Sequence, residues 1–294
     1  MEGTTSAAGA ARDDEGGGRD LVVDAQVHIW AEDTPERPWQ PGGHAHAHID
    51  RPFLAPELIG AMDASGIDRA VLIPPFWEGN RNDLVEQAAI DYPDRFAWLG
   101  RLNLKQDGPE RLHQILARPG AVGVRLTFTR GEALNWLRDG TADWIWPELA
   151  AVGAPVMIFA PGKHQEVAAV ASAHPDLRIA IDHAGIATDV KDQPLLPLIQ
   201  PLLEMAKLPN VAVKATALPC LVSEPFPFPS LREPMRRLLE SFGRERVFWG
   251  TDLTRLPCTY LEARRFAEEL DFLSLEDRRW LLGRAVSLWL GWGE

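Results

Sequence analysis

The sequence predicts an α/β fold in which one chain of strand–helix units closes into a single (β/α)8 TIM barrel. After residue 20, eight short runs rich in apolar and β-branched residues recur, each followed by a helix-like segment. Near-continuous apolar runs of this kind are typical of parallel strands buried on both faces. The length of 294 residues suits one such barrel, which needs about 250 residues.

The predicted strands are Leu21–Trp30, Arg69–Pro75, Phe96–Asn103, Val122–Phe128, Pro155–Ala160, Arg178–Ala184, Asn210–Ala217 and Arg246–Asp252. Amphipathic segments between them predict helices at Pro56–Ser65, Asn82–Asp91, Gln165–Ala173, Leu195–Lys207, Leu231–Phe242 and Tyr260–Leu270. An open doubly wound sheet is the alternative arrangement. It would favour a GxGxxG turn after the first strand, and that pattern is absent there.

A last helix is predicted from Leu275 to about Leu290. It follows Ser274, and Asp277 stands at the capping-box position where Glu or Gln is usual. The first 20 residues are rich in Gly, Ala and acidic residues and lack an apolar segment. We therefore expect residues 1–20 to be a disordered lead-in rather than a signal peptide, and residues 21–294 to form one barrel domain.

Charge and cysteine content exclude several classes of protein. The net charge of −12 argues against a nucleic-acid partner, because phosphate binding needs clustered Lys and Arg. A membrane span needs about 18 consecutive apolar residues. No apolar segment of the sequence approaches this length, so no membrane partner is expected. Cys220 and Cys258 form neither a disulfide framework nor a CxxC metal motif. A cytoplasmic location is the expectation.

Candidate catalytic residues gather at the predicted carboxyl ends of the strands, where parallel barrels place their active sites. Gln26 and His28 are two residues apart and share one face of the first strand. His183 ends the sixth strand and Asp252 ends the eighth. A single His or Asp at a strand end is commonly structural, but three at one rim indicate a function. Imidazole and carboxylate are zinc ligands, and they are also groups that activate water.

The motifs that contain these residues resemble the amidohydrolase superfamily. DAQVHIW, VGVRLTF, IDHAG, NVAVKAT and VFWGTDLTRLP occur in the order and spacing of that family. The chain resembles in particular the amidohydrolase-related (amidohydrolase 2) branch, which includes 2-pyrone-4,6-dicarboxylate lactonase-like hydrolases. The resemblance runs from Leu21 to the C-terminus. It implies that His28 is the second His of an HxH pair, His183 the strand-six His and Asp252 the catalytic Asp.

Gln26 departs from the family pattern, because it stands where the family usually has the first His. A neutral amide is a poor zinc ligand beside imidazole and carboxylate. The expected cofactor is therefore either none or one divalent metal, zinc. If a metal binds, the resemblance implies His28, His183 and Asp252 as its ligands.

The reaction implied by the resemblance is hydrolysis of a small lactone or carboxylic ester. Asp252 would be the general base for water, and His183 and His28 would polarise the carbonyl. Gln26 could donate an amide N–H to the same oxygen. The alternatives are a zinc-dependent non-oxidative decarboxylase of an aromatic or dienoic acid, and a non-catalytic binding barrel.

Residues for substrate binding are predicted at the same rim. Arg125 could hold a substrate carboxylate in a bidentate pair, or form a salt bridge within the barrel; Lys214 is a candidate of the same kind. Trp30 and Trp77 stand at strand ends, where they could line an apolar pocket. His48 lies in a loop of alternating histidines that is most simply a flexible polar loop, yet it opens towards the rim. The expected partner is a small carboxylate or lactone, and a homodimer through the Trp-rich C-terminus is possible.

Overall fold

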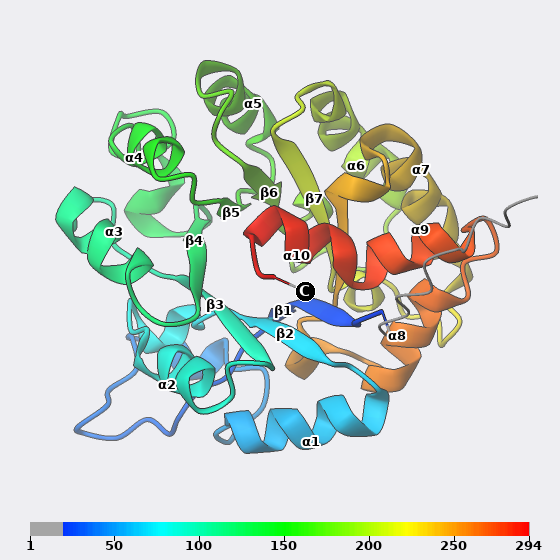
Figure 1. Ribbon diagram of the computed structural model, residues 1–294, viewed down its shortest axis with the longest axis horizontal. Coiled ribbons are helices and arrows are strands. Elements are labelled where there is room, and N and C mark those ends of the chain that lie inside the picture. Colours follow the sequence, from blue (N-terminus) through cyan, green and yellow to red (C-terminus); the bar gives the residue numbers. More distant parts are fainter. Residues whose placement is uncertain (1–19, 294) are drawn as a thin grey trace, which may run out of the picture.

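The eight strands of the barrel all run parallel, and each pairs with the next in the order β1-β2-β3-β4-β5-β6-β7-β8 (Figure 1). The computed structural model describes residues 20–293, so the predicted lead-in lies outside the described residues apart from Asp20. The predicted (β/α)8 barrel is confirmed. The strands are β1 Val23–Val27, β2 Arg69–Leu72, β3 Phe96–Gly100, β4 Ala121–Thr127, β5 Val156–Phe159, β6 Ile179–Ile181, β7 Val211–Thr216 and β8 Val247–Gly250.

Helices surround the strands (Figure 1). They are α1 Ala55–Ser65, α2 Asp83–Asp91, α3 Pro109–Leu116, α4 Ile145–Ala151, α5 His164–Ala173, α6 Leu195–Leu203, α7 Arg232–Phe242, α8 Tyr260–Glu268, α9 Leu275–Arg279 and α10 Ala285–Leu290. The sequence patterns gave no bounds for α3 and α4, which are short. Gly66 ends α1 in a left-handed conformation, as a glycine allows. None of the helices within residues 20–293 is both long and apolar enough to cross a membrane.

The seam between β1 and β8 is held by side chains. The buried carboxylate of Asp24 accepts hydrogen bonds from the Thr251 backbone N–H at 2.9 Å, from the Thr251 hydroxyl, and from the Tyr260 hydroxyl at 2.8 Å. Gly250 is required here, because a Cβ at this position would lie 2.8 Å from Oδ1 of Asp24. The Asp252 N–H then donates to the Gln26 carbonyl at 2.9 Å. This seam therefore fixes the chain on either side of Asp252.

The interior of the barrel changes from apolar to polar along its axis. Leu99, Ala180 and Ala212 pack together inside it with residues of the neighbouring strands. Side chains two residues apart point to the same face of a strand. Arg101, Asp182 and Lys214 therefore follow them on the inner face, towards the carboxyl ends of the strands.

The opposite end of the barrel is closed by the C-terminal helices, with α10 lying across it (Figure 1). The predicted capping box is confirmed, because Ser274 and Asp277 exchange side-chain and backbone hydrogen bonds. The predicted helix from Leu275 to Leu290 is confirmed, and it contains a π-helical turn at Trp280–Arg284 between α9 and α10. That turn brings Gly283 against the backbone of Leu21, where a Cβ would lie 2.1 Å from the carbonyl oxygen.

Candidate active site

Two left-handed turns position the predicted catalytic residues. The sequence patterns extended the sixth strand to Ala184 and the eighth to Asp252, but these strands end at Ile181 and Gly250. His183 has φ 52° and Asp252 has φ 57°, a conformation that costs a residue other than glycine about 1–3 kcal/mol. Such strain persists where the surrounding structure fixes it. The two turns aim both side chains over the mouth of the barrel instead of along its wall.

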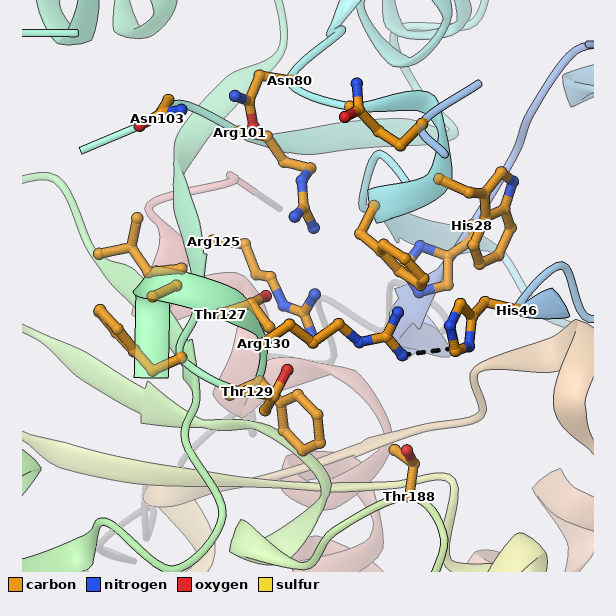
Figure 2. Close-up of a pocket in the computed structure, with 18 of the residues that line it drawn as sticks. His28, His46, Asn80, Arg101, Asn103, Arg125, Thr127, Thr129, Arg130 and Thr188 are labelled. Atoms are coloured by element: carbon orange, nitrogen blue, oxygen red, sulfur yellow. Dashed lines mark hydrogen bonds between the residues drawn. The ribbon is translucent and has the colours of Figure 1, made fainter. Parts of the chain in front are cut away.

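A cavity of about 710 Å³ lies at the carboxyl ends of the strands (Figure 2). His28, His48, Trp77, Arg125, His183 and Asp252, all predicted site residues, line it. The other three predicted residues, Gln26, Trp30 and Lys214, are buried behind the lining. The lining contains four arginines and one carboxylate, that of Asp252.

His28 has a defined orientation. Its Nδ1 lies 2.7 Å from the Ile73 carbonyl oxygen, which only accepts, so Nδ1 carries the proton. In the neutral ring Nε2 is then an acceptor, and it lies 3.3 Å from Oδ1 of Asp252. Burial lowers the pKa of His28 to about 4, although Asp252 opposes this shift. At neutral pH the ring is therefore uncharged.

Asp252 is a buried carboxylate with one oxygen left free. Its Oδ2 lies 3.2 Å from Nη1 of Arg255, whereas Oδ1 accepts no hydrogen bond from the described residues. Burial alone would raise its pKa, but the surrounding imidazoles of His28, His48 and His183 together with Arg255 outweigh burial and hold the pKa below the ordinary value. Asp252 is therefore ionised at neutral pH, and Oδ1 can accept a proton.

His183 is held from behind by Thr216. The Thr216 hydroxyl accepts the His183 backbone N–H at 3.2 Å and lies 2.8 Å from Nδ1 of the ring. When this hydroxyl donates a hydrogen bond to Nδ1, the proton of the neutral ring is on Nε2. Burial lowers the pKa of His183 to about 4. The ring packs edge-on against Phe159 at 5.1 Å between centroids.

A buried charge network lies beneath these groups. The Lys214 ammonium donates to Oε1 of Gln26 and lies 2.9 Å from Oδ1 of Asp182. The other oxygen of Asp182 accepts from Nε of Arg125 at 2.9 Å. Burial would raise the pKa of Asp182, but the two cations hold it below its ordinary value. Arg125 thus forms the predicted salt bridge within the barrel and also lines the cavity with the rest of its guanidinium group.

The loop after β1 covers one side of the cavity. His48 lies in this loop and its Nδ1 is 2.7 Å from the Thr254 hydroxyl. Its ring stands edge-on to Trp77, 5.0 Å between centroids. Trp30 lies behind both residues and donates its indole N–H to the Arg51 carbonyl at 2.9 Å. Trp77 and His48 therefore form an aromatic wall that faces the cavity, and Trp30 supports it.

The arrangement does not fit a preformed metal site. Among residues 20–293, no group of three His, Cys, Asp or Glu side chains is arranged to hold a metal ion. Gln26 turns its Oε1 to Lys214, and its Nε2 lies 3.4 Å from Nε2 of His28. An amide donor and a nearby ammonium stand where the family pattern places a ligand.

The family assignment comes from the whole barrel. Residues 23–288 match the family described as Amidohydrolase. The chain belongs to the amidohydrolase family. The members of this family are enzymes, hydrolases or decarboxylases, so the predicted resemblance is confirmed at this level. No curated protein matches the chain in sequence.

Three solved amidohydrolase-like structures show how widely the fold is shared. An amidohydrolase from Burkholderia multivorans with bound zinc is 20% identical with a TM-score of 0.76, covering 92% of this chain and 99% of that chain. A probable 2-pyrone-4,6-dicarboxylic acid hydrolase from Acinetobacter baumannii with citric acid bound is 17% identical, TM-score 0.73, with coverage of 92% and 99%. A 5-carboxyvanillate decarboxylase from Sphingomonas paucimobilis is 15% identical, TM-score 0.66, with the same coverage. At these identities the likeness concerns the fold.

Four residues of the site were not singled out from the sequence. Arg101, Arg130 and Arg255 line the cavity, and Asp182 is the anion of the network beneath it. The sequence does contain a pattern that indicates Arg101 and Asp182, because each lies two residues beyond an inward-facing apolar residue of a predicted strand. Arg130 and Arg255 lie beyond the strand ends, where no local period indicates which way a side chain points.

Proposed function

We propose that this protein hydrolyses a small lactone or carboxylic ester. The observation that carries the proposal is the ionised Asp252, whose Oδ1 accepts no hydrogen bond from residues 20–293 and faces a cavity large enough for a small substrate. A general base needs a free lone pair within reach of a water molecule. Asp252 takes a proton from the water that attacks the carbonyl carbon, and returns it to the alkoxide that leaves.

The two histidines take different parts in this scheme. His183 donates its Nε2–H to the carbonyl oxygen as negative charge develops there, with Thr216 fixing the ring. His28 holds its Nε2 lone pair beside Asp252 and keeps the proton on Nδ1 bound to Ile73. It therefore leaves Oδ1 of Asp252 free to accept the proton of water, and it donates no hydrogen bond to the oxyanion.

Gln26 and Lys214 support the site from below. Lys214 binds Oε1 of Gln26 and so directs the amide nitrogen towards His28. One N–H of this amide serves Nε2 of His28, so Gln26 acts on the site through that ring and does not contact the substrate itself. Arg125, anchored by Asp182, presents its outer N–H groups to a substrate carboxylate, with Trp77 and His48 forming the wall of the pocket.

A measurement of products separates hydrolysis from decarboxylation, since a carboxylate-binding cavity suits both reactions. Purified protein is given a panel of carboxylate-bearing lactones, aryl esters and hydroxybenzoates, and proton release and carbon dioxide release are recorded in parallel. The proposal expects proton release with one carboxylate formed for each ester bond cleaved. Carbon dioxide release without ester cleavage would replace it with a decarboxylase, and binding without either product would indicate a binding barrel.

A further inference from the structure

Arg255 ends the short turn Leu253–Arg255 that follows Asp252, and its guanidinium group reaches back to that carboxylate. Nη1 donates to Oδ2 of Asp252 at 3.2 Å, and Nη2 donates to the Thr188 carbonyl at 3.1 Å. The Arg255 side chain is mostly buried, with 17% of its surface exposed, and it lines the cavity together with Thr188 (Figure 2). Arg255 therefore joins the carboxylate that follows β8 to the loop that follows β6.

The backbone of Arg255 is also held at both of its polar groups. Its N–H donates to the Asp252 carbonyl at 2.9 Å, and its carbonyl accepts a hydrogen bond from the Cys220 thiol at 3.3 Å. Cys220 lies in the turn Leu218–Leu221, which follows β7. Contacts with the loops after β6 and β7, and with Asp252 itself, therefore fix the position of Arg255.

The two loops that hold Arg255 are joined to each other by Lys191. This residue lies in the loop after β6, and its ammonium group donates to the carbonyls of Cys220 at 3.1 Å and Val222 at 2.6 Å. Both acceptors belong to the segment after β7. The guanidinium group of Arg255 is therefore supported by a pair of cross-linked loops, so its position does not depend on one isolated segment.

This support determines which oxygen of Asp252 is free. The terminal torsion of an aspartate side chain is broad, so a fixed backbone does not by itself hold the carboxylate in one orientation. Oδ1 lies 3.3 Å from Nε2 of His28 and accepts no hydrogen bond from residues 20–293, and two acceptors at this distance do not attract each other. Oδ2 instead accepts the charge-assisted hydrogen bond from Arg255. This bond keeps Oδ1 turned towards His28 and the cavity.

We propose that Arg255 is the positioning residue of Asp252, and that it holds Oδ2 so that the lone pair of Oδ1 stays directed at the attacking water. The inference rests on the proposed function, because that function makes Asp252 the base. Arg255 acts through the carboxylate and exchanges no proton itself. Its loss should therefore lower kcat and leave KM nearly unchanged, whereas the loss of a residue that only binds substrate raises KM.

Steady-state kinetics of R255A, with and without added guanidinium, test this proposal. Misorientation of the base should lower kcat about a hundredfold and change KM by less than about threefold. Guanidinium chloride, at concentrations far below those that unfold proteins, should restore part of the lost kcat, because the free cation can donate to Oδ2. Sodium chloride at the same ionic strength should not. R244A is the control, because Arg244 forms a similar pair with Asp277, 3.5 Å apart, outside the cavity lining. Its kinetics should match those of the wild type and show no rescue.

Two further measurements keep the result decisive if R255A is less stable than the wild type. R255K keeps the positive charge without the planar fork that reaches Oδ2 and the Thr188 carbonyl together, so it should retain only part of kcat. Amide hydrogen exchange of residues 187–192 and 253–256 should be faster in R255A than in the wild type, because Arg255 joins these segments, and unchanged in R244A.

The outcomes separate the positioning role from the proposed reaction. Wild-type kcat in R255A, a loss confined to KM, or a fall in kcat that neither guanidinium nor the lysine variant reverses in part would overturn the positioning role while hydrolysis by the wild type stands. A wild type that cleaves no ester or lactone of the panel would overturn the proposed reaction, and with it the base that Arg255 is proposed to position.

Discussion

Nε2 of His28 and Oδ1 of Asp252 lie 3.3 Å apart, and in the neutral state of the imidazole both are acceptors. The Ile73 carbonyl fixes this state by holding the ring proton on Nδ1. Two lone pairs that face each other at this distance are stabilised when a water molecule or a substrate donates between them. The pair is therefore arranged to take up a proton during the reaction, and its protonation state governs activity.

The first prediction concerns the pH dependence of kcat/KM. Protonated His28 would donate to Asp252 and occupy the oxygen that must accept the proton of water. Because burial lowers the pKa of His28 to about 4, activity should stay constant down to mildly acidic pH and fall as pH decreases through about 4. Initial rates over a pH series, with brief exposure to acid, test this. An inflection near 6.5, the ordinary pKa of histidine, would contradict it.

The second prediction concerns stability against acid. Burial lowers the pKa of His48 to about 3, so the unfolded chain binds a proton there at a pH at which the folded chain does not. The free energy of unfolding should therefore fall as pH decreases from about 6.5, and H48Q should make this fall less steep. Comparing variants cancels the opposite contribution of Asp24, whose pKa burial raises to about 6. Denaturation of the wild type and of H48Q at several pH values measures the two slopes. Equal slopes in wild type and H48Q would be evidence against the account.

The third prediction tests the buried network. Lys214 and Asp182 have fully buried side chains that lie 2.9 Å apart. K214M leaves Asp182 with Arg125 alone and Gln26 without its donor, and should lower the free energy of unfolding by about 3–5 kcal/mol. Urea denaturation measures the loss, with the exposed Lys207→Met as control. K214M/D182N should recover part of the stability, and a loss below about 1 kcal/mol in K214M would contradict this role.

The fourth prediction concerns zinc. Gln26 presents an amide in place of an imidazole, and the Lys214 ammonium beside it repels a divalent cation. Protein purified without added metal should contain far less than one zinc per chain, and dipicolinate should leave its hydrolysis rate unchanged. Elemental analysis and rates before and after chelation are the measurements. Zinc near one per chain, lost together with activity, would show that the side chains bind the metal despite this arrangement.

The sequence predicted correctly where the two-residue alternation along a strand determines the direction of a side chain. Alternation along a strand placed Gln26 and His28 on one face, and the parallel arrangement brought His28, His183 and Asp252 to one rim. Both inferences need only the spacing of nearby residues and the common direction of the parallel strands. They therefore held although the predicted strand ends were wrong by two or three residues.

What the sequence could not predict depends on contacts between distant residues. Lys214 was a candidate for binding substrate, but it lies beneath Gln26, a residue 188 positions away in the chain. The left-handed turn at His183 is fixed by Thr216 of the next strand, and that at Asp252 by the seam with β1. The buried Nε and Nη1 of Arg101 have no hydrogen-bond partner among residues 20–293, and this likewise depends on the whole cavity. No local pattern indicates which charges a fold leaves without a partner.

The central claim, that Asp252 is the general base of an ester or lactone hydrolase, is tested most directly by D252N. Asp192 provides a matched control, because it also has a left-handed backbone, φ 53° against 57°, and Asn tolerates this conformation as well as Asp does. Proton release is followed at constant pH with the best lactone or ester of the panel. The account predicts a rate about a thousandfold lower in D252N with an unchanged melting temperature, and a wild-type rate in D192N. A folded D252N that hydrolyses the substrate at the wild-type rate would contradict the mechanism.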